Sequence, residues 1–129
     1  MREIALAGLA LLAAAVSLAV TAQLHHSSGH GPRAVGSFTA LAGAAGPAAV
    51  GRRTACGEIL TADMEGVAHP TLPCGAKIFI TYGHQTVLVQ VIDRGPYVPG
   101  RQFDLTDALA RRLGLHGVQQ IQWSYAQTG

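Results

Sequence analysis

Aromatic residues and charged residues are both scarce in this sequence. Phe, Trp and Tyr make up 5% of its 129 residues, and charged residues make up 12%, with a net charge of +2. Lys77 is its only lysine, so the chain has no dense basic patch, and nucleic acid is excluded as its main partner. The length accommodates one small domain. The 16 glycines show no period of three, which excludes collagen, and with six prolines they favour turns and strands over a helical bundle.

Long apolar runs are also rare, and the one present lies at the start of the chain. Ile4 to Val20 contains no charge, follows Met1-Arg2-Glu3, and is followed by the short side chains of Thr21 and Ala22. This pattern predicts a signal peptide over residues 1–22, cleaved after Ala22. An uncleaved membrane anchor is the alternative, because the run approaches the length of a spanning helix, roughly 20 residues. Since no cysteine lies near the cleavage site, we expect an exported protein that is not lipid-anchored.

Cysteine is limited to Cys56 and Cys74. Export would place this pair in a compartment where disulfides persist, so the sequence predicts a Cys56–Cys74 bond. Two cysteines are too few for a zinc site, and no histidine lies at ligand spacing from them. A disulfide that closes this loop would stabilise the domain by about 3 kcal/mol in the chain-entropy model.

Residues 23–36 form a polar stretch that contains Gly, Ser and His. Because such a stretch buries little apolar surface, we interpret it as a flexible linker to a domain over residues 37–129. A metal bound by His25, His26 and His30 is the less favoured alternative to a simple tether.

The domain shows several β-rich runs and one helical pattern. We expect strands at residues 38–41, 77–82, 86–92 and 121–125, with Gly83-His84 as a two-residue hairpin turn. Val87, Val89 and Val91 should face the core together. Residues 107–113 form a helix with Thr106 as N-cap and Gly114 at its end. Short strands, one short helix and a disulfide indicate a small closed barrel, which leaves no exposed edge.

The densest polar cluster follows the Val-rich strand, where Asp93 and Arg94 precede Gly95 and Pro96. Side chains of neighbouring residues in an extended backbone point to opposite sides. Asp93 can therefore face a groove while Arg94 points elsewhere. The sequence leaves an equal alternative open, in which Asp93 caps the turn or pairs with Arg94.

Three further residues are candidates for a site. Glu58 and His69 lie close in sequence to the two cysteines, so a disulfide could bring them to one cleft. The simpler interpretation of His69 is a turn residue bonded by backbone. Asp104, just before the helix cap, is expected to accept hydrogen bonds from loop N–H groups, which is a structural role.

Four ordered blocks of this chain together resemble the rare lipoprotein A (RlpA-like) family: Thr54-Ala55-Cys56-Gly57-Glu58; Val67 to Gly75; Val91 to Tyr97; and Gly100-Arg101 with Asp104-Leu105-Thr106. The resemblance covers about residues 54–126. It implies a mainly β fold, a six-stranded double-psi β-barrel with one or two short helices. It also implies a lytic transglycosylase that cuts peptidoglycan glycan, preferring strands stripped of peptide, and leaves 1,6-anhydro ends.

By the same resemblance, Asp93, Glu58 and His69 match the family's catalytic Asp, Glu and His. Thr61 stands where the family commonly has an acidic residue, and Gly46-Pro47-Ala48-Ala49 replaces an aromatic-Gly block. Tyr97, Arg94 and Thr61 are the expected substrate-binding residues, with the Tyr97 ring as a stacking face for a sugar. Loop packing is the alternative role for that ring.

The chemistry implied needs a carboxyl that can hold a proton. An attack by the sugar's own 6-hydroxyl needs no external water, so one acid/base group, Asp93, can suffice where ordinary hydrolysis uses two carboxylates. To protonate the leaving oxygen, Asp93 needs a pKa above about 3.9, raised by burial or by a neighbouring carboxylate such as Glu58. His69 would position the sugar or the acid.

The sequence therefore predicts a secreted, monomeric lytic transglycosylase of the bacterial cell wall. Its expected partners are peptidoglycan glycan strands, with cell-division or wall-synthesis proteins as candidate protein partners, and it needs no cofactor and no metal. We expect no membrane insertion after signal cleavage. A non-catalytic, expansin-like wall-loosening module is the main alternative. A secreted inhibitor on the same scaffold is the third, without a sequence feature in its favour.

Overall fold

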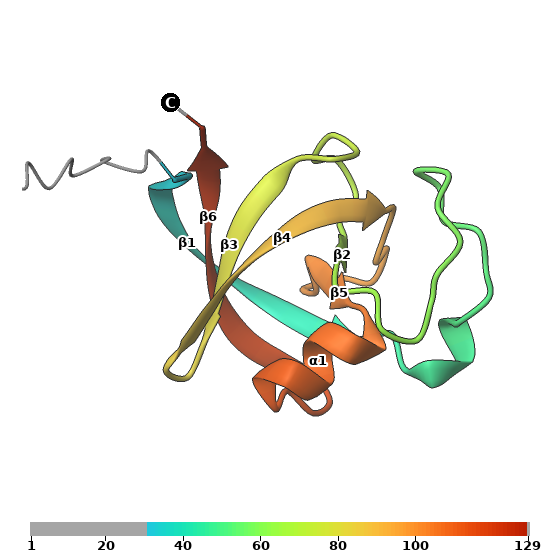
Figure 1. Ribbon diagram of the computed structural model, residues 1–129. Coiled ribbons are helices and arrows are strands. Elements are labelled where there is room, and N and C mark those ends of the chain that lie inside the picture. Colours follow the sequence, from blue (N-terminus) through green and yellow to red (C-terminus); the bar gives the residue numbers. More distant parts are fainter. Residues whose placement is uncertain (1–30, 129) are drawn as a thin grey trace, which may run out of the picture.

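A computed structural model describes residues 31–128, and the predicted signal peptide and His25, His26 and His30 lie outside this range. The described chain forms a closed barrel with strand order β1-β5-β2-β4-β3-β6 (Figure 1). Its strands are β1 (Arg33–Ala44), β2 (Val67–Ala68), β3 (Lys77–Tyr82), β4 (Gln85–Asp93), β5 (Phe103–Leu105) and β6 (Gln119–Gln127). The helices are the 3-10 turn η2 (Pro47–Ala49) and α1 (Asp107–Leu113). The mainly β, six-stranded double-psi barrel is thereby confirmed.

The β3–β4 hairpin follows the sequence prediction closely. Tyr82 pairs with Gln85, so Gly83 and His84 form the two-residue turn, and Gly83 has a positive φ of 60°. Glycine adopts this backbone conformation without steric cost. Val87, Val89 and Val91 are all buried and face the barrel interior, as their alternation predicts.

The helix α1 also begins and ends at the predicted residues. The Thr106 side chain accepts a hydrogen bond from the Leu109 N–H, and Gly114 takes the left-handed conformation at the C-cap. Leu109 and Leu113 are buried, so the helix covers the barrel with its apolar stripe. Within residues 31–128, neither helix has the length and apolarity that crossing a membrane requires.

The start of the domain differs from the prediction. A linker is expected to reach Gly36, whereas β1 already begins at Arg33 and pairs antiparallel with β6, from Arg33 opposite Gln127 onward. The residues before Phe38 bury little side-chain area, so their composition alone indicates a linker. Backbone pairing with β6, a partner far away in sequence, forms the strand instead.

Two short strands, β2 and β5, close the barrel between longer ones. β5 runs parallel to β1 and antiparallel to β2, while β2 runs parallel to β4. This arrangement places the ends of β4, β2 and β5 side by side, and these ends carry the polar residues singled out in the sequence.

Candidate functional site

Two aspartates flank one alanine across three neighbouring strands. Ala68 in β2 pairs with Asp93 in β4 on one side and with Asp104 in β5 on the other. Paired residues in adjacent strands point to the same face, and strands lie about 4.8 Å apart, so the two Cα atoms are about 10 Å apart. The two carboxyl groups therefore lie on either side of a space beside Ala68.

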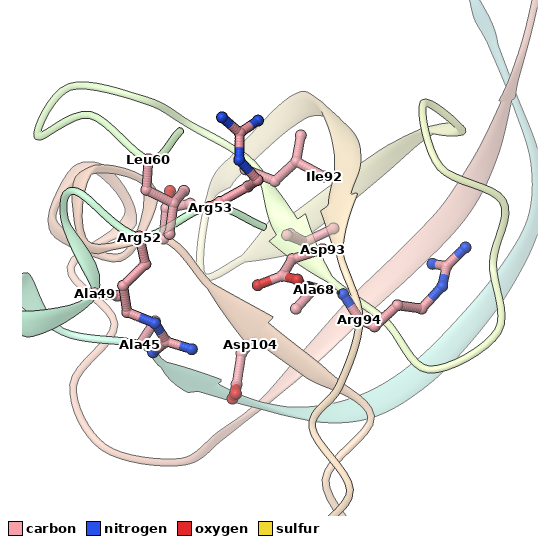
Figure 2. Close-up of a pocket in the computed structure, with 12 residues that line it drawn as sticks. Ala45, Ala49, Arg52, Arg53, Leu60, Ala68, Ile92, Asp93, Arg94 and Asp104 are labelled. Atoms are coloured by element: carbon pink, nitrogen blue, oxygen red, sulfur yellow. Dashed lines mark hydrogen bonds between the residues drawn. The ribbon is translucent and has the colours of Figure 1, made fainter. Parts of the chain in front are cut away.

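This space is a cavity of about 160 Å³ on the outside of the barrel. It lies between the barrel strands and the segment that follows β1 and contains η2 (Figure 2). Three arginines and two aspartates supply its ionisable groups. The full lining is Ala45, Ala49, Arg52, Arg53, Leu60, Val67, Ala68, Ile92, Asp93, Arg94, Asp104 and Thr106.

The Asp93 carboxyl is held by backbone N–H groups and does not pair with the Arg94 guanidinium. Its Oδ1 accepts hydrogen bonds from the Ala55 N–H and the Arg94 N–H, each at 2.8 Å. The Arg94 guanidinium donates to the carbonyl oxygens of His69 (3.3 Å) and Leu72 (2.6 Å), and Figure 2 shows it directed away from Asp93. Oδ2 of Asp93 has no hydrogen-bond partner within residues 31–128. One carboxylate oxygen is thus fixed by backbone N–H groups and the other is available to a ligand.

A disulfide-linked turn delivers the N–H of Ala55 to Asp93. The Thr54 N–H donates to the Glu58 carbonyl at 2.7 Å, and the Thr54 hydroxyl accepts from the Glu58 N–H at 3.1 Å. Cys56, inside this turn, is bonded to Cys74, as predicted. The turn is therefore tied to the loop before β3, and its backbone is held over the end of β4.

Asp104 combines a structural contact with a place in the cavity. Its Oδ1 lies 3.1 Å from Nε of Arg101, as an ion pair. The sequence predicts that Asp104 accepts from loop N–H groups, but within residues 31–128 no backbone N–H donates to its carboxyl, and Arg101 is its partner instead. The carboxyl also lines the cavity that contains Asp93. Gly43 makes room for the pair, since a Cβ there would lie 3.2 Å from Asp104 Oδ1. Burial raises the pKa of Asp104, Arg101 opposes that rise, and the charge of Asp93 adds to it. Asp104 is the carboxyl of this cavity whose proton is retained more readily than usual.

The backbone of His69 lies beside that of Asp93, but the imidazole ring of His69 contacts other groups. The His69 N–H donates to the Asp93 carbonyl at 3.2 Å. The ring nitrogen Nδ1 accepts from the N–H groups of Thr71 (3.1 Å) and Leu72 (3.0 Å), and the ring centroid lies 4.8 Å from that of Phe103. Burial, and secondarily the charge of Arg94, lower the pKa of His69. The geometry matches a neutral imidazole that organises the turn before Cys74.

We expect His69→Ala to lower the free energy of unfolding by about 1–2 kcal/mol, because two backbone N–H groups lose their acceptor. Because the folded-state pKa is lowered, the stability that neutral His69 contributes is present above about pH 6.5 and is lost as pH falls through the folded-state pKa. Denaturant unfolding at neutral and mildly acidic pH measures both effects. His84→Ala, in the exposed hairpin turn, is the control and should change neither. Equal stability of wild type and His69→Ala would contradict this role.

Three other predicted site residues lie outside the cavity lining. Glu58 is exposed on the disulfide-linked turn, and Tyr97 is 77% exposed after β4. The Thr61 hydroxyl donates to Asp63 Oδ1 at 2.7 Å. Of the residues predicted to be catalytic, Asp93 alone contributes to the lining of this cavity.

Sequence reasoning missed the arginines on the opposite wall. Arg52 and Arg53 line the cavity, and Arg53 Nη1 donates to the Gly57 carbonyl at 2.9 Å. Their only signal in the sequence is an Arg-Arg pair just before the Thr54–Glu58 block. Within residues 31–128, no group of three or more His, Cys, Asp or Glu side chains is placed to hold a metal ion.

Comparison with known families and proteins gives a consistent result. A family described as lytic transglycolase matches residues 43–125. The endolytic peptidoglycan transglycosylase RlpA of Yersinia pestis is 45% identical over 85 residues, which is 64% of this chain and 23% of that protein. The RlpA of Pasteurella multocida is 42% identical over 69 residues, or 52% of this chain and 24% of that protein. The chain thus spans about a quarter of the length of these relatives.

Two solved structures share the fold. The Streptomyces papain inhibitor superposes with a TM-score of 0.59 at 24% identity, covering 73% of this chain and 97% of the inhibitor. An expansin from Clavibacter michiganensis gives the same TM-score at 23% identity, covering 73% of this chain and 52% of the expansin. At this level of identity, both similarities concern the fold alone.

Proposed function

Because the chain belongs to the RlpA-like lytic transglycolase family, we propose that it cleaves the glycan strands of peptidoglycan and leaves 1,6-anhydro ends. Strands stripped of peptide are its preferred substrate in this proposal. The observation that supports it most directly is the pair of carboxyl groups, Asp93 and Asp104, on either side of one cavity. The RlpA relatives are named endolytic peptidoglycan transglycosylases, which supports peptidoglycan as the substrate.

The two carboxyl groups suit opposite halves of the proton transfer. Asp104, whose pKa is raised by burial, donates a proton to the glycosidic oxygen that leaves. Asp93, with Oδ2 available, accepts the proton of the 6-hydroxyl as that oxygen attacks the anomeric carbon of the same sugar. The C–O bond to the leaving sugar breaks and the 1,6-anhydro bond forms, without water as a reactant. Proton transfer from Asp93 to Asp104 through solvent restores the starting state.

This scheme changes the mechanism expected from the sequence. Asp93 keeps its place in proton exchange, but the second carboxyl of the cavity lining is Asp104, and Glu58 is not part of that lining. Glu58 and His69 keep indirect roles, because Glu58 belongs to the turn that orients Ala55, and the carbonyl of His69 helps to hold Arg94.

The scheme predicts a pH dependence that Arg101 controls. Activity should fall as pH rises through the raised pKa of Asp104, because the acid loses its proton. Arg101→Gln removes the charge that opposes this rise, so the falling limb of the pH–rate profile should move to higher pH. Arg112→Gln, which breaks the distant ion pair with Glu65, is the control and should leave the limb in place. A falling limb that does not move in Arg101→Gln would exclude Asp104 as the acid.

We place this reaction in the bacterial cell envelope. The Cys56–Cys74 disulfide suits an oxidising compartment, and the predicted signal peptide would deliver the chain there. The protein acts as a monomer on glycan in this proposal, and cell-division or wall-synthesis proteins are its candidate protein partners.

A wall-binding module without catalysis is the second candidate. Two observations favour it. Among residues 31–128, no aromatic residue lines the cavity, and Thr61 stands where the family commonly has an acidic residue. Incubation of the purified protein with denuded sacculi distinguishes the two candidates. Soluble sugars with anhydro ends support the enzyme, whereas binding without release supports the module.

A further inference from the structure

Arg52 is the arginine of the cavity lining whose guanidinium has no hydrogen-bond or ion-pair partner within residues 31–128. The other two arginines of the lining are engaged, since Arg53 donates to the Gly57 carbonyl and Arg94 to the carbonyls of His69 and Leu72. Arg52 makes no ion pair and no side-chain hydrogen bond within residues 31–128. Figure 2 shows its guanidinium reaching past Ala45 on the side of the cavity where Asp104 lies.

The backbone that carries Arg52 is fixed. The Gly51 N–H donates to the Leu60 carbonyl at 2.8 Å, and the Leu60 N–H donates to the Arg52 carbonyl at 2.9 Å. An antiparallel bridge between Arg53 and Ile59 continues this pairing toward the disulfide-linked turn. Arg52 is therefore presented from a braced hairpin, with its side chain exposed and free to meet a ligand.

Arg52 is the cation of the cavity that is left for a ligand, and it suits an anionic substituent. Three arginines line the cavity, but the guanidinium groups of Arg53 and Arg94 are engaged by backbone carbonyls. In peptidoglycan glycan, the anion attached to the sugar itself is the lactyl carboxylate of the muramic acid unit. That carboxylate is free only where the stem peptide has been removed, because otherwise it forms an amide.

We propose that Arg52 binds the lactyl carboxylate of the reacting muramic acid and thereby selects peptide-free strands. The inference rests on the proposed function, because it assigns a substrate group to the same cavity. The planar guanidinium of arginine matches a carboxylate through two parallel hydrogen bonds, which a neutral amide cannot reproduce. The same sugar supplies the attacking 6-hydroxyl, so Arg52 also orients the reacting unit between Asp104 and Asp93.

The test compares denuded sacculi with the same sacculi after their lactyl carboxylates have been converted to methylamides. Wild type should release anhydro ends about tenfold faster from the free carboxylate form, because the loss of one charged hydrogen-bonded pair weakens binding by about tenfold. Arg52→Gln should release ends from both forms at the slower rate. Arg33→Gln, which removes an exposed charge at the start of β1, should behave like wild type.

Binding of Asp93→Asn protein to the two forms, measured by co-sedimentation, separates this inference from the proposed function. Preferential binding to the carboxylate form that Arg52→Gln abolishes supports the inference, even where no ends are released. Equal discrimination by wild type and Arg52→Gln overturns the inference and leaves the function intact. Tighter binding to peptide-bearing sacculi that Arg52→Gln abolishes also overturns it, because stem-peptide carboxylates would then be the anion.

Discussion

Asp93→Asn is expected to lower the release of anhydro-ended glycan by at least about 100-fold, within the range that general acid–base catalysis contributes. Asparagine cannot accept the proton of the 6-hydroxyl. Its side-chain oxygen can still accept the hydrogen bonds from Ala55 and Arg94 that Asp93 Oδ1 accepts now. The variant should therefore unfold at the same denaturant concentration as wild type, to within about 1 kcal/mol in unfolding free energy.

Asp63→Asn is the matched control, because Asp63 is an exposed carboxylate outside the cavity lining. It should retain the wild-type rate. If Asp93→Asn released anhydro-ended glycan at a rate close to that of Asp63→Asn, Asp93 would have no part in the mechanism.

The second large effect is expected from the disulfide. Replacing Cys56 and Cys74 together by serine should reduce the free energy of unfolding by about 3 kcal/mol, because the cross-link closes a loop with a sequence separation of 18. This is a substantial part of the roughly 5–15 kcal/mol by which small domains are stable. Activity should fall as well, since the turn that presents the Ala55 N–H to Asp93 loses its tie to the loop before β3.

Denaturant unfolding and rate measurement on the double serine variant check both effects, with reductant-treated wild type as the control for the two hydroxyl groups. The two proteins should agree. A double variant as stable as wild type would mean that the barrel alone holds the turn in place.

The elements that the sequence predicts well are those whose information is local. The alternation of Val87, Val89 and Val91 and the turn at Gly83 define the β3–β4 hairpin, and Thr106 with Gly114 defines α1. β2 and β5, with two and three residues, are too short for periodicity, and their pairings run between segments distant in sequence. The first residues of β1 are strand for the same reason, because their partner is β6.

The residues of the site also differ in how well the sequence predicts their positions. Asp93 follows a buried strand and precedes Gly95-Pro96, so the sequence offers it as a groove residue, with a turn cap or a pair with Arg94 as the equal alternative; in the structure it lines the cavity. The nearness of Asp104 to Asp93 depends on β2 lying between β4 and β5, and no local pattern encodes that order. Arg94 could equally pair with Asp93 by sequence, and the carbonyls of His69 and Leu72 that hold it become visible only when the loop before β3 is folded.

In the proposed reaction, the 6-hydroxyl of the sugar, and not water, attacks in the cavity between Asp93 and Asp104. Digestion of denuded glycan in water enriched in heavy oxygen, followed by mass spectrometry of the new ends, distinguishes the two nucleophiles. We expect ends that are one water lighter than reducing ends and carry no heavy oxygen. New reducing ends that contain heavy oxygen, or intact strands that only bind the protein, would contradict the proposal.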